Sequence, residues 1–317
     1  MLSDHSKLAD LSDLTGLRLL EAQIAGALAV VPIIGSSDSP PLDYPLLDDA
    51  LASGTARITE VSEGGQVPEL LFLNKGAKPV LLLDGEELVG AKQNRILNLT
   101  ILVPAYSEIR IPVSCVERGR WSWRSREFAG SDRALYAEAR RSKMAQVSDS
   151  MRHGSWSSDQ SALWEGIASK SARMEAHSTT GAASAMYEQS TDDFERMLNI
   201  VRPVPGQVGA GFLIRGSLVG VELFSSPAHL GRLLPKLVRS YGLDALDQGS
   251  KRSNRSQSSA SGDSLEEFMN SLMEMKPERH PAVGLGEDWR LRGQRALGAA
   301  LVHDGRLVHL SAFVGKA

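Results

Sequence analysis

Side chains that can do chemistry gather around the single cysteine of this 317-residue chain. The stretch from Ile111 to Trp121 is IPVSCVERGRW, in which Cys115 precedes Glu117 and an Arg-Gly-Arg-Trp run. A thiolate can act as a nucleophile, a glutamate as a general base and an arginine as an anion-binding group. These residues form either a reactive site or the buried end of a strand followed by a solvated turn.

Two roles are open for Cys115. It can be a small core residue, because free cysteine is among the most buried residue types. Alternatively, Arg95 or Arg120 lowers its pKa and makes the thiolate nucleophilic. A thiolate nucleophile usually works with a histidine base, and no histidine lies between His5 and His153. The sequence therefore favours the core role.

Strands must position these residues. The runs RILNLTILV (95–103) and EIRIPVSCV (108–116) are rich in branched residues, and we expect them to pair as an antiparallel hairpin. Side chains that face each other across such a pair lie on the same face, and a slip by one residue would expose a whole apolar set. This rule limits the pairing to a small number of registers.

The length of the connecting loop selects between two registers. A five-residue loop places Leu97 opposite Cys115 and Arg95 opposite Glu117, where an ion pair caps the apolar face. A three-residue loop instead places Arg95 opposite Cys115 and Gln93 opposite Glu117. In both registers Gln93, Arg95, Cys115 and Glu117 converge at one end of the hairpin.

A charged pair at the end of an apolar face is costly to desolvate unless it is well satisfied. One explanation is structural, in which Arg95 and Glu117 fix the register of the strands. The other is a site in which Glu117 is the catalytic base, Gln93 orients the substrate and Arg95 holds an anion.

The segment from Arg118 to Arg126 interleaves arginine with tryptophan. If it is extended, its arginines share one face and its tryptophans the other. Arginine suits phosphate groups and tryptophan stacks on a base, although tryptophans behind an arginine stripe can also pack into a core. The predicted ligand-binding residues are Lys92, Arg95, Arg120, Trp121, Trp123 and Arg124.

Charge is distributed unevenly along the chain, whose net charge is −3. Residues 1–91 carry 5 Lys/Arg against 14 Asp/Glu, and residues 92–152 carry 12 against 6. A basic block in an acidic protein favours an anionic small ligand over nucleic acid. We find no Walker loop, no dinucleotide fingerprint and no histidine or cysteine pattern typical of a metal site, so the sequence indicates no metal-ligating residue and leaves the cofactor unknown.

We expect a cytoplasmic protein that does not bind membranes. One cysteine cannot form an internal disulfide, so the fold needs no oxidising compartment. The N-terminus lacks the basic and apolar regions of a signal peptide, and no apolar run approaches the roughly 20 residues that span a bilayer.

The order of predicted elements indicates a single α+β domain over residues 14–317. A β-rich, antiparallel and sandwich-like part covers 14–128, and a helical part covers 129–200. The remainder, 201–317, combines hairpins with helices and contains a polar, low-complexity link at 247–264 that we expect to be mobile.

Local signals predict several turns and caps. Asp84-Gly85, Arg215-Gly216 and Asp304-Gly305 are typical of hairpin turns. Predicted helix N-caps and starts are Asp132, Ser158 or Asp159, Ser190 with Asp193, and Pro227. Glu222 lies inside an apolar strand pattern, and we expect it to face solvent across a half-exposed sheet.

The run LLLDGEELVGAKQNRILNLTILVPAYSEIRIPVSCVERGRW resembles a known family, the ARG and rhodanese-phosphatase-superfamily-associated protein domain, where ARG stands for ADP-ribosylglycohydrolase. The likeness extends over about residues 25–315. The motifs that carry it are Gly85-Glu86, Gly90, Lys92-Gln93-Asn94-Arg95, Val113-Ser114-Cys115-Val116-Glu117, Arg120-Trp121, Asp159-Gln160 with Trp164, Ser178-Thr179-Thr180, and the stretches GVELFSSP, LVRSYGLDAL and LVHDGRLVHLSAF. The family motif often has Asp at the position of Asn94.

The resemblance implies association with ADP-ribose or phosphoester metabolism and assigns no catalytic role to a residue. Our first hypothesis is therefore a domain that binds, and processes if it is an enzyme, an ADP-ribose-like or other phosphorylated nucleotide. The alternative is a non-catalytic accessory module that docks a partner enzyme, in which Arg95 and Glu117 are structural.

Overall fold

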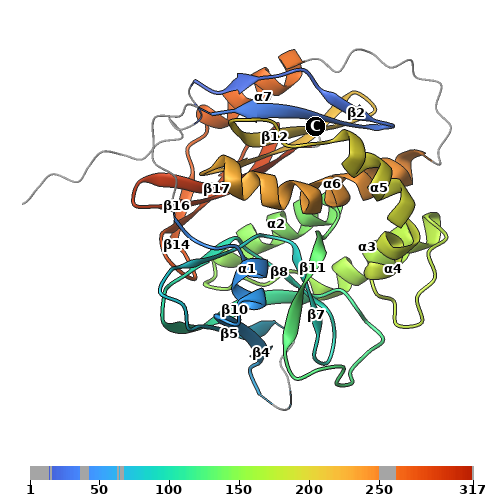
Figure 1. The fold of residues 1–317 in the computed structure, drawn as a ribbon, viewed down its shortest axis with the longest axis vertical. Coiled ribbons are helices and arrows are strands. Elements are labelled where there is room, and N and C mark those ends of the chain that lie inside the picture. Colours follow the sequence, from blue (N-terminus) through green and yellow to red (C-terminus); the bar gives the residue numbers. More distant parts are fainter. Residues whose placement is uncertain are drawn as a thin grey trace, which may run out of the picture.

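The computed structural model describes residues 14, 16–35, 43–62, 64, 68–249 and 262–315. Within these residues the chain forms seven helices and seventeen strands, and the sheets are antiparallel. The predicted α+β class is confirmed. Among the described helices, none combines the length and the apolar character needed to cross a membrane. Figure 1 shows a larger sheet and a smaller sheet, with helices between and beside them.

The larger sheet combines strands from both ends of the chain. Its order is β1 (Arg18–Leu19), β3 (Leu28–Ile34), β12 (Gln207–Ile214), β13 (Ser217–Phe224), β17 (Arg306–Val314), β16 (Ala296–His303), β15 (Glu287–Arg292) and β14 (Glu278–Pro281), and β2 (Gln23–Ala25) also pairs with β3. Helix α6 (Pro227–Gly249) packs on one face and α7 (Gly262–Met273) on the other. Because both faces are covered, strands such as β12 are apolar at nearly every position.

Helix α7 approaches the larger sheet closely at Gly211 in β12. A Cβ atom at this position would lie 2.4 Å from a methyl carbon of Leu265 in α7. Glycine therefore allows α7 to sit directly on the sheet, where its buried residues join Val31, Leu213 and Leu310 in one cluster.

The smaller sheet carries the candidate site. Its order is β11 (Phe128–Ala134), β7 (Glu86–Gly90), β8 (Arg95–Leu97), β10 (Ser107–Cys115), β5 (Glu69–Asn74) and β4 (Ala56–Glu60). A separate pair of strands, β6 (Val80–Leu82) and β9 (Ile101–Val103), packs against it in a shared apolar cluster that also contains α1 (Leu47–Ala52). The β-rich part is thus layered, as a sandwich is.

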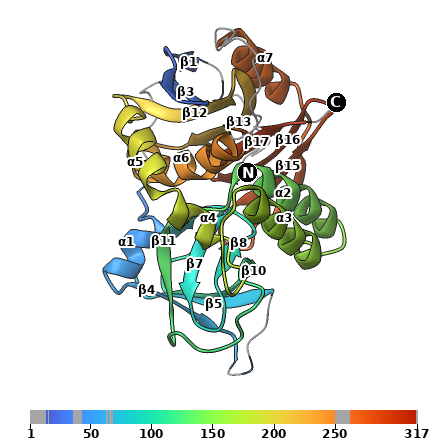
Figure 2. The same ribbon diagram turned by 90° about the vertical axis from the view of Figure 1, so that its right-hand side faces the viewer.

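Four helices follow the smaller sheet, namely α2 (Ala137–Met151), α3 (Gln160–Arg173), α4 (Ser184–Gln189) and α5 (Thr191–Ile200). Figure 2 shows α2 and α3 side by side below the larger sheet. The predicted cap of α3 is confirmed, because the Asp159 carboxylate accepts from the amides of Ser161 and Ala162 at 2.9 and 3.0 Å. Helix α6 begins at Pro227, as predicted.

The predicted hairpin between residues 95–103 and 108–116 is wrong. Strand β9 pairs with β6, and the first part of β10 pairs with β5, so only β8 lies opposite the end of β10. The turn at Asp84-Gly85 exists, but the strands on its two sides pair with other strands. Local turn chemistry was identified correctly, whereas the partners come from distant parts of the chain.

Other local predictions divide in the same way. The hairpins β12–β13 and β16–β17 are confirmed. Asp132 is not a helix cap, because it lies in β11 and α2 starts at Ala137. Ser190 precedes α5 but forms no capping bond with its side chain. Most of the predicted link lies outside the described residues, and α6 and α7 occupy its two ends.

Candidate functional site

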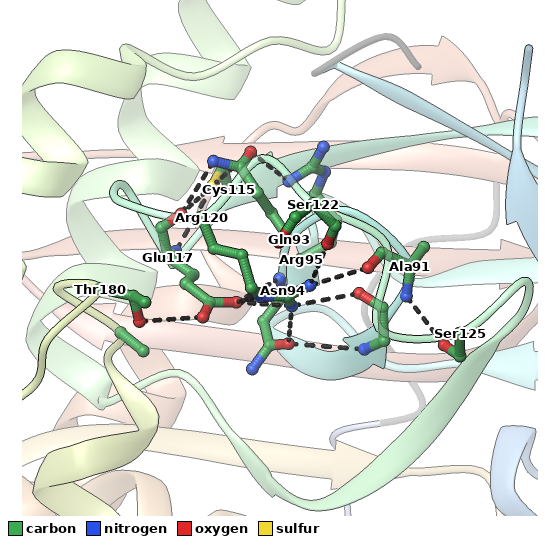
Figure 3. A network of polar contacts seen from close by, with 12 residues as sticks. Ala91, Gln93, Asn94, Arg95, Cys115, Glu117, Arg120, Ser122, Ser125 and Thr180 are labelled. Atoms are coloured by element: carbon green, nitrogen blue, oxygen red, sulfur yellow. Dashed lines mark hydrogen bonds and ion pairs between the residues drawn. The ribbon is translucent and has the colours of Figure 1, made fainter. Parts of the chain in front are cut away.

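The alternative register is correct at the end of β10. Cys115 lies opposite Arg95, and Val113 lies opposite Leu97. Beyond the strand, the Gln93 amide donates to the backbone carbonyl of Glu117 at 2.9 Å. The expected convergence is therefore found for Gln93, Arg95, Cys115 and Glu117. The predicted ion pair between Arg95 and Glu117 is wrong, because Glu117 pairs with Arg120 (Figure 3) and the carboxylate nearest to Arg95 is that of Glu60.

Glu117 is held by four donors. Its Oε2 accepts from the backbone amide of Asn94 at 3.1 Å and lies 2.9 Å from Nε and 2.7 Å from Nη2 of Arg120. Its Oε1 accepts from the Thr180 hydroxyl at 2.9 Å. Burial alone would raise the pKa of this carboxyl, but these donors hold the pKa below its usual value. The geometry is that of an ionised anchor, whereas a general base needs a pKa near the working pH.

Arg120 uses its guanidinium to fix the turn after β7. Its Nη1 donates to the carbonyls of Ala91 at 2.7 Å and Ser122 at 3.0 Å, and its Nη2 donates to Gly90 at 3.3 Å and to Asn94 Oδ1 at 3.1 Å. Ala91 has a φ of 38°, an unfavourable left-handed conformation for alanine. Arg120 and the Ser125 hydroxyl, which accepts from the Ala91 amide, support this turn.

Cys115 and Arg95 are both fully buried. The Cys115 sulfur lies 3.1 Å from Gln93 Oε1 and 3.3 Å from the Glu117 carbonyl. Burial raises the pKa of the thiol despite the nearby Arg95 charge. An enclosed thiol with a raised pKa is a core residue and not a reactive nucleophile.

The segment after Glu117 is a loop and not a strand, so its arginines and tryptophans do not separate onto two faces. We call residues 118–126 the tryptophan loop. Trp121 and Trp123 are 49% and 44% exposed, and the Lys92 ammonium lies 5.2 and 5.1 Å from the two ring centres. The guanidinium of Arg126 lies over Trp123 at 5.7 Å, and Arg124 is exposed.

Sequence reasoning missed Glu60, at the end of β4. Its side chain faces inward near Arg95, with Glu60 Oε1 3.9 Å from Arg95 Nη2. The period of two in β4 could have predicted its burial, because Glu60 lies on the same face of the strand as Ala56 and Ile58. The Ser178-Thr179-Thr180 motif contributes through Thr180, whose hydroxyl donates to Glu117 Oε1 at 2.9 Å.

A second charged cluster lies between the two sheets. The prediction that Glu222 faces solvent is wrong, because its side chain is fully buried and binds Arg140 at 2.7 Å and His309 Nε2 at 3.0 Å. Burial opposes ionisation, but Arg140 and His309 lower the pKa of Glu222 to about 2. Beside this cluster a cavity of about 10 Å³ has room for about one water molecule. We regard the cluster as structural because it is closed.

Arg95 and Glu117 are enclosed, with 0% and 5% exposure. Five cavities in the described part of the chain are lined by residues other than Gln93, Arg120 and the tryptophans. Within the same residues, no group of three His, Cys, Asp or Glu side chains is placed to bind a metal ion. The site is therefore an exposed loop above a closed polar anchor.

The chain was compared with known proteins and protein families. Neither the curated proteins nor the solved structures gave a match to the chain. A family model described as the ARG and Rhodanese-Phosphatase-superfamily-associated Protein domain matches residues 16–313, which include both sheets and the tryptophan loop. The chain therefore belongs to the ARG and Rhodanese-Phosphatase-superfamily-associated Protein domain family.

Proposed function

We propose that the tryptophan loop binds a phosphorylated nucleotide of the ADP-ribose class. The observation that carries this proposal is the pair of half-exposed indoles, Trp121 and Trp123, with the Lys92 ammonium near both rings. Large apolar rings in water at a basic loop are well suited to stack on a base, and such stacking contributes about 1–3 kcal/mol per base. The family description, which refers to ADP-ribosylglycohydrolase, supports this ligand class.

The arginines of the loop have different roles in this proposal. Arg120 is occupied by the turn that it supports, and the predicted contact of Arg95 with phosphate needs a rearrangement because Arg95 is buried. Arg118, Arg124 and Arg126 are exposed and can reach phosphate oxygens. We assign phosphate binding first to Arg124, which adjoins Trp123.

We assign binding and no reaction to this loop. The catalytic roles predicted for Glu117 and Gln93 gain no support, because Glu117 is an ionised anchor and both ends of the Gln93 amide are engaged. The alternative, an accessory module that docks a partner enzyme, also assigns no reaction to the loop. In that alternative the docking surface is the same exposed loop. A binding assay separates the two.

The test is isothermal titration calorimetry of the protein with ADP-ribose, AMP, NAD and a short RNA. We expect ADP-ribose to bind, and Trp123→Ala or Arg124→Ser to weaken binding about tenfold, as the loss of one stacked base or one charge-assisted contact would. Arg110→Ser is the matched control, because Arg110 is an exposed arginine of the same sheet that pairs with Glu69. Binding that Arg110→Ser weakens as much as Arg124→Ser, or no binding at all, would refute the proposal and favour the docking alternative.

A further inference from the structure

Below the tryptophan loop, the buried side chains of Glu60 and Arg95 carry polar atoms that have no hydrogen-bond partner among the described residues. Among the residues that the structure describes, neither carboxylate oxygen of Glu60 accepts a hydrogen bond of ordinary geometry, and Nε and Nη2 of Arg95 donate none. Burial raises the pKa of Glu60, and the charges of Arg95 and Lys92 and the Lys92 backbone amide oppose this rise. The side chains are 2% and 0% exposed, and the shortest distance between their charged groups is 3.9 Å. Buried polar groups are nearly always hydrogen-bonded, so this arrangement requires an explanation.

The pair is held apart by its surroundings. Arg95 Nη1 donates to Gln93 Oε1 at 2.8 Å, and Gln93 is itself bound to the Glu117 carbonyl, so the guanidinium is fixed from the other side. Glu60 ends β4, where its backbone is fixed by pairing with Leu70. The 3.9 Å contact between Glu60 and Arg95 is about 1 Å longer than a hydrogen-bonded ion pair.

The unused groups have a definite chemistry. Nε and Nη2 form one edge of the guanidinium, with two parallel N–H donors. Glu60 adds two acceptors beside that edge. A ligand that completes both must offer acceptors and donors next to each other, and a neutral ligand does so without placing a like charge against Glu60 or Arg95. Two adjacent hydroxyl groups satisfy these conditions, since each hydroxyl both donates and accepts.

Trp121 connects this pair to the surface. The Arg95 guanidinium lies 5.8 Å from the Trp121 ring centre, and the ring is 49% exposed. The pair opens to the surface only if the Trp121 side chain turns outward, while the bond from Arg120 to the Ser122 carbonyl keeps the loop backbone in place. A sugar could then enter below the ring, while the attached base remains at the surface beside Trp123.

We propose that Glu60 and Arg95 form a sugar subsite that takes the adjacent 2′- and 3′-hydroxyls of a ribose. This inference rests on the proposed function, since it assigns the ribose part of the same nucleotide ligand. In this subsite the hydroxyls donate to Glu60 and accept from Nε and Nη2 of Arg95, and Trp121 packs over the sugar. The nucleotide is distinguished from its deoxy form at Glu60.

The test compares AMP with 2′-deoxyadenosine monophosphate by calorimetry on the whole chain. The wild-type protein should bind AMP at least about tenfold more tightly, because the deoxy form leaves buried polar groups unpaired. Glu60→Ala should bind both nucleotides within about twofold of each other, since the acceptors that read the hydroxyl are gone. Glu127→Ala, which removes an exposed glutamate that pairs with Arg57 next to the loop, should keep the preference.

The outcomes separate the subsite from the loop. Equal binding of the two nucleotides by the wild-type protein overturns the subsite, even if Glu60→Ala fails to fold. If Trp123→Ala still weakens AMP binding in that case, the loop binds a nucleotide by another route and the proposed function stands. Absence of binding of either nucleotide, and of ADP-ribose, overturns both.

Discussion

Glu87 in β7 should make the stability of the protein fall as the pH rises from 4.5 to about 7. Its side chain is 4% exposed to solvent, accepts from Asn94 Nδ2 at 3.2 Å and lies 3.2 Å from Arg133 Nε. Burial raises the pKa of this carboxyl to about 7, although Arg133 and Asn94 oppose the rise. The folded protein therefore binds a proton that the unfolded chain has already released.

The sign and size of the effect follow from this difference. Between the ordinary value of 4.5 and about 7, the folded state holds more protons than the unfolded state, so the free energy of unfolding falls as the pH rises. Each pKa unit corresponds to 1.36 kcal/mol, so a shift of about 2.5 units removes about 3 kcal/mol over this window. Below pH 4.5 this contribution is fully present, and above pH 7 it is lost.

Urea unfolding of the wild type and of Glu87→Gln, between pH 4.5 and 8, measures this difference. We expect the variant to gain about 3 kcal/mol relative to the wild type across the window, because glutamine does not ionise. Asp244, whose pKa burial raises to about 6, contributes with the same sign in both proteins and cancels in the comparison. Glu108→Gln, which removes an exposed carboxyl of β10, is the control. Parallel curves for the wild type and Glu87→Gln would refute the reasoning.

Three further variants test other contacts. Asn94→Asp places a second carboxylate against Glu87, so its stability relative to the wild type should be lower at pH 8 than at pH 5 in urea unfolding; the same deficit at both pH values would contradict this. Glu222→Gln removes the nearer of the two carboxylates beside the buried Arg140 and leaves Asp84, 3.6 Å from Arg140 Nε, as its counter-charge. The change should cost about 3 kcal/mol, read from the urea midpoint, whereas a loss below about 1 kcal/mol would show that the Glu222 pair is dispensable. Asp159→Ala removes the cap of α3 and should cost about 1 kcal/mol in a circular-dichroism melt, with Asp159→Asn restoring most of it.

Local rules predicted the pieces of the site better than their assembly. The rule that paired side chains share one face of the sheet limited the pairing to two registers, one of which places Cys115 opposite Arg95 as in the structure. The rule applies because a slip by one residue would expose an apolar face. Loop length could not select the register, because β9 and β10 do not form a hairpin. Strand β9 leaves the sheet to pair with β6, and such a choice depends on the packing of a whole layer, which adjacent sequence does not contain.

For buried charged residues, the sequence could predict the burial but not the partner. The alternation in β4 places Glu60 on the inner face, and the apolar run of β13 places Glu222 inside, so their burial was open to prediction. Their partners were not, since Arg140 comes from α2 and His309 from β17. A charged residue in an apolar pattern indicates that a partner exists, while only the fold identifies it.

The arginines after Glu117 have different roles, which follow from their surroundings and not from their spacing in the sequence. Arg120 and Arg124 belong to one motif by residue type, yet Arg120 satisfies carbonyls of a strained turn and Arg124 is exposed. Because Arg120 holds the loop backbone, Trp121 and Trp123 can remain half-exposed without the loop collapsing onto the sheet. An anchor below and rings above are the arrangement that a stacking surface needs. A test of ligand binding should therefore change Trp123 or Arg124 and leave Arg120 intact, since loss of the anchor would remove the surface together with any contact that it makes.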